Sequence, residues 1–247
     1  MDVRKPPFDD MRVRQALNYA IDRDHVVELL GGPTSQRPTC QIFPPNFPGY
    51  EPFCPYTLEP DSGAWSAPDL DRARALIEDA DAIGEEVTVW VMAEDPAIVD
   101  PVETMRYVVE VLNDLGLRAY LKIVHPEKYF GTIYGEGEPN AYLSGWISDY
   151  PRAANFIDAQ FRCGAGGNAS HLCSESLDAQ IEEVLRLQAT NPAAANAAWV
   201  EIEHRLVEDA VWAPLTNPVS AYAFSARTEI VQFHPQWGIL ISRLWVQ

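Results

Sequence analysis

A strand, a helix and a second strand follow one another between residues 87 and 124, and this order constrains the fold more than any other feature. Residues 87–92 form an almost entirely apolar, β-branched run, which is typical of a strand covered on both sides. A helical pattern then begins at about Pro101 and stops at Gly116, and residues 117–124 form the second strand. A connection of this length implies a parallel pair with a right-handed crossover.

Helical periodicity and short β-branched runs surround this unit. Further helices are expected at about residues 10–30, 69–82, 126–134, 156–161, 176–189 and 192–208, and further strands at about 140–146, 211–216 and 219–224. The composition, with 47% hydrophobic and 22% charged residues, is that of a packed protein. The sequence therefore predicts an α/β lobe in which helices flank a mixed, mainly parallel sheet.

Four cysteines form two pairs by position. Cys40 and Cys54 lie within residues 33–66, a stretch rich in proline and aromatic residues that would be uncommon as a loop unless stapled or functional. Cys163 and Cys173 flank a glycine-rich run. Four cysteines allow three pairings, of which the local one is the simplest. A disulfide across either loop would close a ring of roughly 11 to 15 residues and contribute about 2 to 3 kcal/mol.

The cysteines leave two alternatives open. They are either free buried thiols or part of a metal site in which His171 joins Cys163 and Cys173, although the short Cys-x-x-Cys spacing of zinc sites is absent. We expect disulfides, an oxidising compartment, and neither a metal ion nor another cofactor. The first eight residues lack the apolar stretch of a secretory signal. Either the protein is cytosolic, or the chain has lost its natural N-terminus.

The charge balance limits the partners of the chain. It has 36 acidic and 18 basic residues, which gives a formal net charge of −18. Phosphate backbones and anionic lipid surfaces repel such a chain, so we expect no nucleic-acid binding. No apolar run approaches the ~20 residues that a membrane-spanning helix needs, so we expect no direct insertion into a membrane.

The most suggestive chemistry lies in residues 144–151, because no nucleophile elbow, metalloprotease motif or phosphate loop is present. A strand that ends at Trp146 and is followed by Asp149 at a turn places an aromatic face and a carboxylate at the carboxyl edge of a sheet. Open α/β sheets bind ligands at this edge. Trp146 is suited to an apolar or cationic group and Asp149 to an ammonium group. Alternatively, Trp146 belongs to the core and Asp149 caps a turn.

Several motifs, in one order, resemble the second lobe of family 5 extracellular solute-binding proteins, the peptide- and nickel-binding receptors of ABC importers. They are PFDDMRVRQALNYAIDR (7–23), LDRARALI (70–77), LNDLGL (112–117), GWISDYP (145–151), SLD (176–178), APL (213–215) and LW (244–245). The resemblance covers nearly the whole chain. It implies a lobe of the periplasmic-binding-protein type II fold that carries a long stapled loop.

The resemblance also implies a binding site. In that family the segment similar to Trp146 and Asp149 lines the cleft between two lobes, and in peptide-binding members the aspartate pairs with the amino terminus of the peptide. Carried over to this sequence, the ligand-binding residues are Trp146, Asp149, Tyr150 and Arg152, with Arg152 available for a ligand carboxylate. Residues 151–154 depart from the acidic or proline-containing stretch that is often found there.

Whole family members are roughly twice as long as this chain and close a ligand between two lobes by hinge bending. We expect residues 1–215 to form the second, C-terminal lobe and residues 216–247 to return towards a first lobe that the chain lacks. The implied function is that of the substrate-binding component of an ABC importer, which binds a peptide or similar small solute without catalysis. Its partners would be the permease subunits, and its place the periplasm or the cell surface, where a lipoprotein anchor would hold the full-length protein.

Two other functions fit the residues less well. The same lobe could serve as the ligand-sensing module of a regulatory protein, which would predict a cytosolic setting and reduced cysteines. A hydrolase could use Asp149 and Asp158 as paired carboxylates for glycoside cleavage, although the two residues are expected on different elements.

Overall fold

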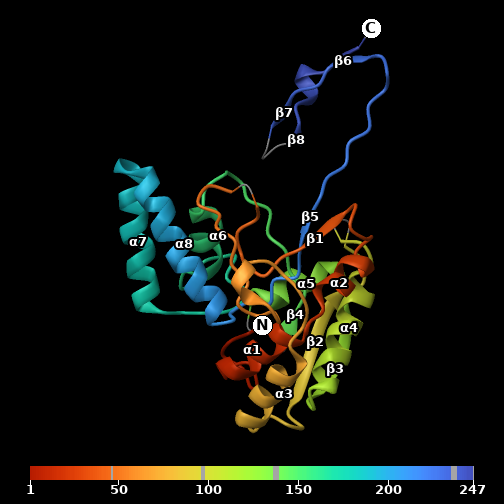
Figure 1. The fold of residues 1–247 in the computed structure, drawn as a ribbon, viewed down its shortest axis with the longest axis vertical. Coiled ribbons are helices and arrows are strands. Elements are labelled where there is room, and N and C mark those ends of the chain that lie inside the picture. The colour runs from red at the N-terminus through yellow and green to blue at the C-terminus, as the bar shows by residue number, and fades with distance from the viewer. Residues whose placement is uncertain (46, 96–97, 136–138, 235–237, 247) are drawn as a thin grey trace.

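The computed structural model describes residues 1–45, 47–95, 98–135, 139–234 and 238–246 (Figure 1). Its helices are α1 (Met11–Ala20), α2 (Arg23–Leu29), α3 (Leu70–Asp79), α4 (Pro101–Asp114), α5 (Pro126–Ile133), α6 (Ala154–Phe161), α7 (Glu175–Thr190), α8 (Pro192–Glu208) and the short 3-10 helices η1 (Pro60–Ser62) and η2 (Ile241–Arg243). Its strands are β1 (Gln36–Pro38), β2 (Glu86–Met92), β3 (Arg118–Val124), β4 (Ala141–Tyr142), β5 (Thr216–Pro218), β6 (Thr228–Ile230), β7 (Phe233–His234), β8 (Gly238–Ile239) and β9 (Trp245–Val246).

Polar side chains mark where the helices begin. The carboxylate of Asp10 accepts a hydrogen bond from the backbone N–H of Arg12 at 2.8 Å, at the start of α1. Asp22 caps α2 in the same way, and Asp69 caps α3. Each cap satisfies a backbone donor that has no partner within its helix. The helix starts that the sequence predicted near residues 10 and 69 are therefore confirmed, whereas the helix expected at 10–30 is divided at Asp22 into α1 and α2.

The predicted strand–helix–strand unit forms the centre of the fold. β2 and β3 pair in parallel through α4, and β4 pairs in parallel with the other edge of β2, so the sheet order is β3-β2-β4. Side chains alternate along β2: Val89 and Val91 belong to the main core, whereas Trp90 and Met92 belong to a smaller cluster. That cluster also contains Tyr129 of α5. Both faces of β2 are therefore buried, which explains its nearly continuous apolar sequence.

The sheet is narrower than predicted. The strand expected at 140–146 is limited to β4, because the hydroxyl of Tyr129 donates to the carbonyl of Leu143 at 2.5 Å and the chain turns away from β2. The strand expected at 211–216 overlaps β5 only at Thr216, and residues 219–224 form no strand. β5 forms an antiparallel pair with β1, and β6–β9 and β7–β8 are further antiparallel pairs.

The long loop after β1 is stapled to the body from two sides. A disulfide joins Cys40 to Cys54, whose Cα atoms are 4.9 Å apart. The buried carboxylate of Glu203 on α8 accepts hydrogen bonds from the backbone N–H groups of Ile42 at 2.9 Å and Phe43 at 2.8 Å. A loop of this length normally exposes its backbone polar groups to water, and here α8 satisfies part of them.

The second disulfide joins Cys163 to Cys173 across the glycine-rich loop between α6 and α7. Cys173 is exposed, whereas Cys40 and Cys54 are both buried. We therefore expect a limiting amount of reductant to open the Cys163–Cys173 bond first, because thiol–disulfide exchange needs access to a sulfur atom. Alkylation, digestion and mass spectrometry would measure the order. Equal or earlier labelling of Cys40 and Cys54 would contradict this expectation.

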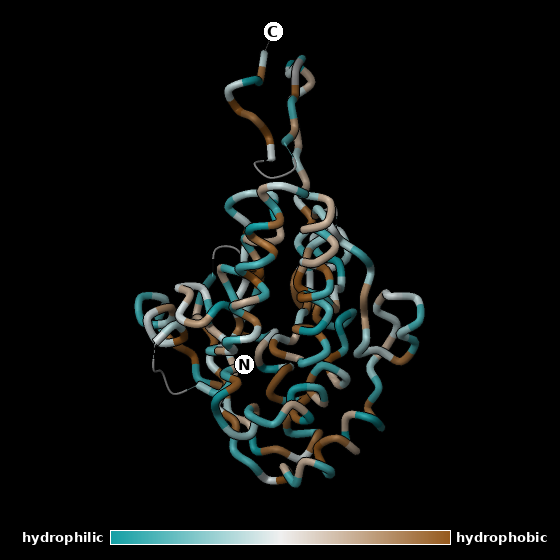
Figure 2. Tube along the Cα trace, turned by 90° about the vertical axis from the view of Figure 1, so that its left-hand side faces the viewer, coloured by the Kyte–Doolittle hydropathy of each residue, from teal (hydrophilic) through white to brown (hydrophobic). Residues whose placement is uncertain are grey.

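The chain after β5 extends away from the body and ends in the β6–β9 and β7–β8 pairs (Figure 1). Figure 2 shows apolar residues along this projecting segment. Tyr222, Phe233, Ile241 and Trp245 are among its exposed apolar side chains. An exposed apolar surface of this kind is typical of a contact site for another protein part.

Candidate functional site

The residues that the sequence singled out lie in the segment between β4 and α6. Because β4 runs parallel to β2, the residues that follow β4 lie at the carboxyl edge of the sheet. Figure 1 shows this segment as a green loop on the side of the body from which the C-terminal segment departs. The structure therefore brings Trp146, Asp149, Tyr150 and Arg152 to one edge.

One buried amide holds two of these residues. The Asn155 Oδ1 atom accepts a hydrogen bond from Trp146 Nε1 at 3.0 Å and a second from the backbone N–H of Asp149 at 2.9 Å. The Nδ2 group of Asn155 donates to Asp149 Oδ2 at 3.2 Å. The side chains of Trp146 and Asp149 are thereby linked through Asn155.

The outer face of this segment is open. Trp146 is half-buried and packs against the main core, whereas Asp149, Tyr150 and Arg152 are exposed. The apolar side chain of Ile147 is 79% exposed, which is high for an isoleucine in a folded chain. The segment therefore presents an aromatic and aliphatic part beside a carboxylate and a guanidinium group.

Asp149 does not cap the helix that follows it. The first turn of α6 has no side-chain cap, and the side-chain contact of Asp149 is with Asn155. Of the alternative considered for this segment, the packing of Trp146 against the core is observed. Sequence reasoning missed Asn155. One signal in the sequence could have found it. Asn155 is a single amide among apolar residues in the first turn of the helix that follows Trp146 and Asp149, and it is buried with those apolar residues.

The two carboxylates considered for hydrolysis have different partners. Asp158 forms an ion pair with Arg162, with an N···O distance of 3.2 Å, and Arg162 also pairs with Glu182 of α7 at 2.5 Å. Asp149 contacts the neutral amide of Asn155 instead. Asp158 is therefore engaged by a guanidinium group, whereas Asp149, among the described residues, is not, and the two carboxylates do not form the matched pair that glycoside cleavage needs.

His171 and the two cysteines beside it form no metal site. Cys163 and Cys173 are joined in a disulfide, and His171 Nε2 lies 3.9 Å from a carboxylate oxygen of Asp2. Burial lowers the pKa of His171, although the nearby Asp2 opposes this shift. In the described ranges, no cluster of three or more His, Cys, Asp and Glu residues could hold a metal ion. In the same ranges, no helix combines the length and apolar character that a membrane span requires.

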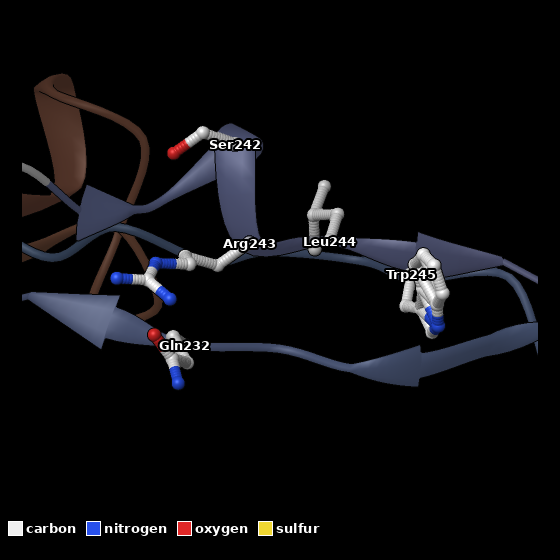
Figure 3. A pocket seen from close by; sticks show the side chains of 5 residues that line it. All are labelled: Gln232, Ser242, Arg243, Leu244 and Trp245. Atoms are coloured by element: carbon white, nitrogen blue, oxygen red, sulfur yellow. The ribbon is translucent and has the colours of Figure 1, made fainter.

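Two hollows of the surface lie away from the segment between β4 and α6. One of about 310 Å³ lies in the C-terminal segment, lined among others by Gln232, between β6 and β7, and Arg243 of η2 (Figure 3). Another of about 580 Å³ lies between the start of α1 and the end of α3, beside Asp10 and Asp81. Neither is lined by Trp146.

Comparisons with known proteins point to one family. Residues 1–168 match the family described as "Bacterial extracellular solute-binding proteins, family 5 Middle". The chain is 24% identical over 238 residues to a probable di/tripeptide-binding protein 5 of Pseudomonas aeruginosa, covering 94% of this chain and 41% of that protein. It is also 24% identical over 225 residues to the periplasmic oligopeptide-binding protein OppA of Escherichia coli, covering 88% of this chain and 38% of that protein.

Solved structures show the same fold. The clavulanic acid biosynthesis oligopeptide binding protein 2 superimposes with a TM-score of 0.85 and 26% identity, over 100% of this chain and 45% of that one. A dipeptide-binding protein from Pseudoalteromonas sp. SM9913, in complex with Met-Leu, has a TM-score of 0.80 and 20% identity, over 100% of this chain and 47% of that one. The fold is that of a periplasmic-binding-protein type II lobe. The chain spans less than half the length of these proteins.

Proposed function

Because the chain belongs to the bacterial extracellular solute-binding proteins of family 5, we propose that it is the second lobe of the substrate-binding component of an ABC importer. We further propose that its solute is a peptide or a similar small molecule with an ammonium group. The observation that carries this proposal is the exposed carboxylate of Asp149 beside the half-buried indole of Trp146, at the carboxyl edge of the sheet. The names of the relatives, which are di/tripeptide- and oligopeptide-binding proteins, support it.

As one wall of a binding site, the segment from Trp146 to Arg152 offers complementary groups for the two ends of a peptide. Asp149 binds the amino terminus, Trp146 and Tyr150 contact apolar parts of the ligand, and Arg152 binds a carboxylate. Closure of a second lobe over this wall would remove water from the amine–carboxylate pair, and such a charge-assisted hydrogen bond is stronger when it is shielded. The site therefore works by binding and shielding, without a catalytic step.

The exposed C-terminal segment supports the proposed division of the chain. Residues 1–215 form the second lobe, and residues 216–247 return to a first lobe that covers their exposed apolar side chains, among them Phe233 and Trp245. In the complete receptor, closure by hinge bending presents both lobes to the permease subunits. The two disulfides favour a place outside the cytoplasm, in the periplasm or at the cell surface with a lipoprotein anchor.

A peptide titration followed by nuclear magnetic resonance tests the proposal. Trialanine at millimolar concentration is expected to shift the indole N–H signal of Trp146, and N-acetylated trialanine to shift it much less, because acetylation removes the ammonium charge. Asp149→Asn is expected to abolish this difference, because it removes the charged partner. Asp158→Asn is the matched control, since Asp158 lies on α6 but pairs with Arg162, and it should keep the difference.

Two outcomes would contradict the proposal. Equal responses to the free and acetylated peptides would mean that Asp149 does not recognise the amine. We assign only half of the binding site to this chain. If isothermal titration showed that the chain alone binds trialanine with low-micromolar affinity, this assignment would be wrong. We expect little or no heat of binding, because half of a binding site leaves most of the ligand surface in water.

A further inference from the structure

We propose that Asn155 is a positioning residue that sets the carboxylate of Asp149 and the indole of Trp146 as one unit for a ligand ammonium group. This inference rests on the proposed function and assigns its specificity to a residue that does not itself contact the ligand. Asn155 is 3% exposed, so its amide faces the protein.

The hydrogen bonds leave Asn155 one orientation. Its Oδ1 atom has two lone pairs, which accept from Trp146 Nε1 at 3.0 Å and from the backbone N–H of Asp149 at 2.9 Å. Its Nδ2 group donates to Asp149 Oδ2 at 3.2 Å. Its own backbone N–H donates to the carbonyl of Arg152 at 2.9 Å. A flipped amide would place two donors against donors, so the observed orientation is strongly preferred.

Because the amide of Asn155 is uncharged, it determines which ligand groups the carboxylate of Asp149 can bind. Asn155 orients Asp149 through Oδ2 and contributes no positive charge of its own. Among the described residues, the hydrogen bonds and ion pairs of Asp149 leave its other oxygen, Oδ1, available to a ligand. Asp158 instead forms an ion pair with Arg162, with an N···O distance of 3.2 Å. An oriented but unneutralised carboxylate favours a cation over an anion or a neutral group.

The same amide couples the charge to the aromatic wall. The indole N–H of Trp146 and the backbone of Asp149 share one acceptor atom, so a movement of either changes the geometry of the other. The ring of Trp146 and the carboxylate of Asp149 are therefore held in a set relation, which fits a ligand whose ammonium group lies next to an apolar part. The amino end of a peptide has this chemistry.

Two substitutions separate the two roles of the amide. Asn155→Ala removes all three side-chain hydrogen bonds. Asn155→Asp keeps an acceptor for Trp146 and for the backbone of Asp149 but replaces the donor with a second carboxylate. Adjacent carboxylates tend to share a proton near neutral pH, so the attraction for an ammonium group then varies with pH.

The test follows the indole N–H signal of Trp146, assigned with Trp146→Phe, and the response to trialanine and its N-acetylated form. In Asn155→Ala we expect the indole signal of Trp146 to differ from its wild-type position even without peptide. We also expect the preference for trialanine over N-acetylated trialanine to fall at least tenfold. In Asn155→Asp we expect the indole signal to stay in place, and the trialanine response to become pH-dependent between pH 5 and 7. In the wild type this response should be flat over that range.

The inference is overturned if Asn155→Ala keeps its amine preference within twofold of wild type, or if Asn155→Asp responds like wild type at every pH. If Asn155→Ala does not fold, Asn155→Asp decides alone. Failure of the proposed function would appear differently, as a wild-type protein that does not prefer the free amine. The position of the indole signal in the two variants would then still decide whether Asn155 orients Trp146.

Discussion

Replacement of Arg23 with methionine is expected to lower the free energy of unfolding by about 3 to 5 kcal/mol, a large fraction of the stability of a typical domain. Arg23 is 0% exposed. Its guanidinium group donates to the carbonyls of Thr39 at 2.9 Å, Pro214 at 2.9 Å and Asn18 at 3.0 Å. Methionine fills a similar volume but leaves these buried acceptors without a donor, which costs about 1 to 3 kcal/mol for each such group.

The reason for this large effect is that Arg23 joins three parts of the chain. Its hydrogen bonds connect the end of α1, the start of the stapled loop and the residues before β5. Burial lowers the pKa of Arg23 to about 10, so the side chain is still charged at neutral pH. It is also held by a cation–π contact, with its Cζ atom 4.9 Å from the ring centre of Trp65.

Urea denaturation with intact disulfides would measure the effect of Arg23→Met. Arg74→Met is the matched control, because the side chain of Arg74 is 52% exposed and its contact with Asp71 is long, at 3.8 Å. An exposed pair of this kind contributes at most about 1 kcal/mol, so the control should be close to wild type. A loss of less than about 1 kcal/mol in Arg23→Met would show that the buried carbonyls find other partners.

Replacement of Glu203 with alanine is expected to cost about 3 kcal/mol or more. The carboxylate of Glu203 is 0% exposed and accepts hydrogen bonds from the backbone of Ile42 and Phe43, and its two oxygens lie 3.3 and 3.2 Å from Gln41 Nε2. Alanine leaves these buried donors unsatisfied and opens a cavity beneath the stapled loop. Circular dichroism during urea unfolding would measure the loss.

Glu203 also predicts how stability depends on pH. Burial raises the pKa of Glu203 from 4.5 to about 7, opposed by the hydrogen bonds from Phe43, Gln41 and Ile42. The folded chain therefore holds the proton of Glu203 more tightly than the unfolded chain does. The stabilisation from this proton is complete below about pH 4.5 and is lost as the pH rises through about 7. The total is about 3 kcal/mol, as expected for a shift of this size.

Comparison with Glu203→Gln isolates this contribution, because glutamine does not titrate. Between pH 4.5 and 8 the stability of the wild type should fall relative to that of Glu203→Gln. Glu201→Gln, on the exposed side of α8, serves as the control and should follow the wild type. A constant difference between wild type and Glu203→Gln across this range would mean that Glu203 is ionised throughout.

Local patterns were sufficient to predict most of the secondary structure. The strand–helix–strand unit was predicted from the apolar run of β2, the helical periodicity of α4 and the stop at Gly116, and the structure confirms it. The helix starts expected near residues 10 and 69 coincide with the caps at Asp10 and Asp69. These features succeed because they depend on neighbours within a few residues, where the geometry of a helix or strand is the same in every protein.

The edges of the sheet were predicted less well. The apolar run before Trp146 has the pattern of a strand, but its backbone beyond β4 bonds to the side chain of Tyr129 on α5. The run at 219–224 likewise has strand-like residues, but it lies exposed in the C-terminal segment. Whether a strand-like run joins a sheet depends on a partner strand, and the sequence pattern alone does not contain this information.

The sequence by itself determined the α/β class, the helix starts and, through its motifs, the family and the segment from Trp146 to Arg152 that forms the proposed site. The tertiary structure alone decided which polar groups are buried together. Asn155 reaches Trp146 across 9 residues, whereas Arg23 and Pro214 are separated by 191 residues and Glu203 and Ile42 by 161. A buried polar side chain is stable only where donors and acceptors from such distant segments converge, and no local pattern records that convergence.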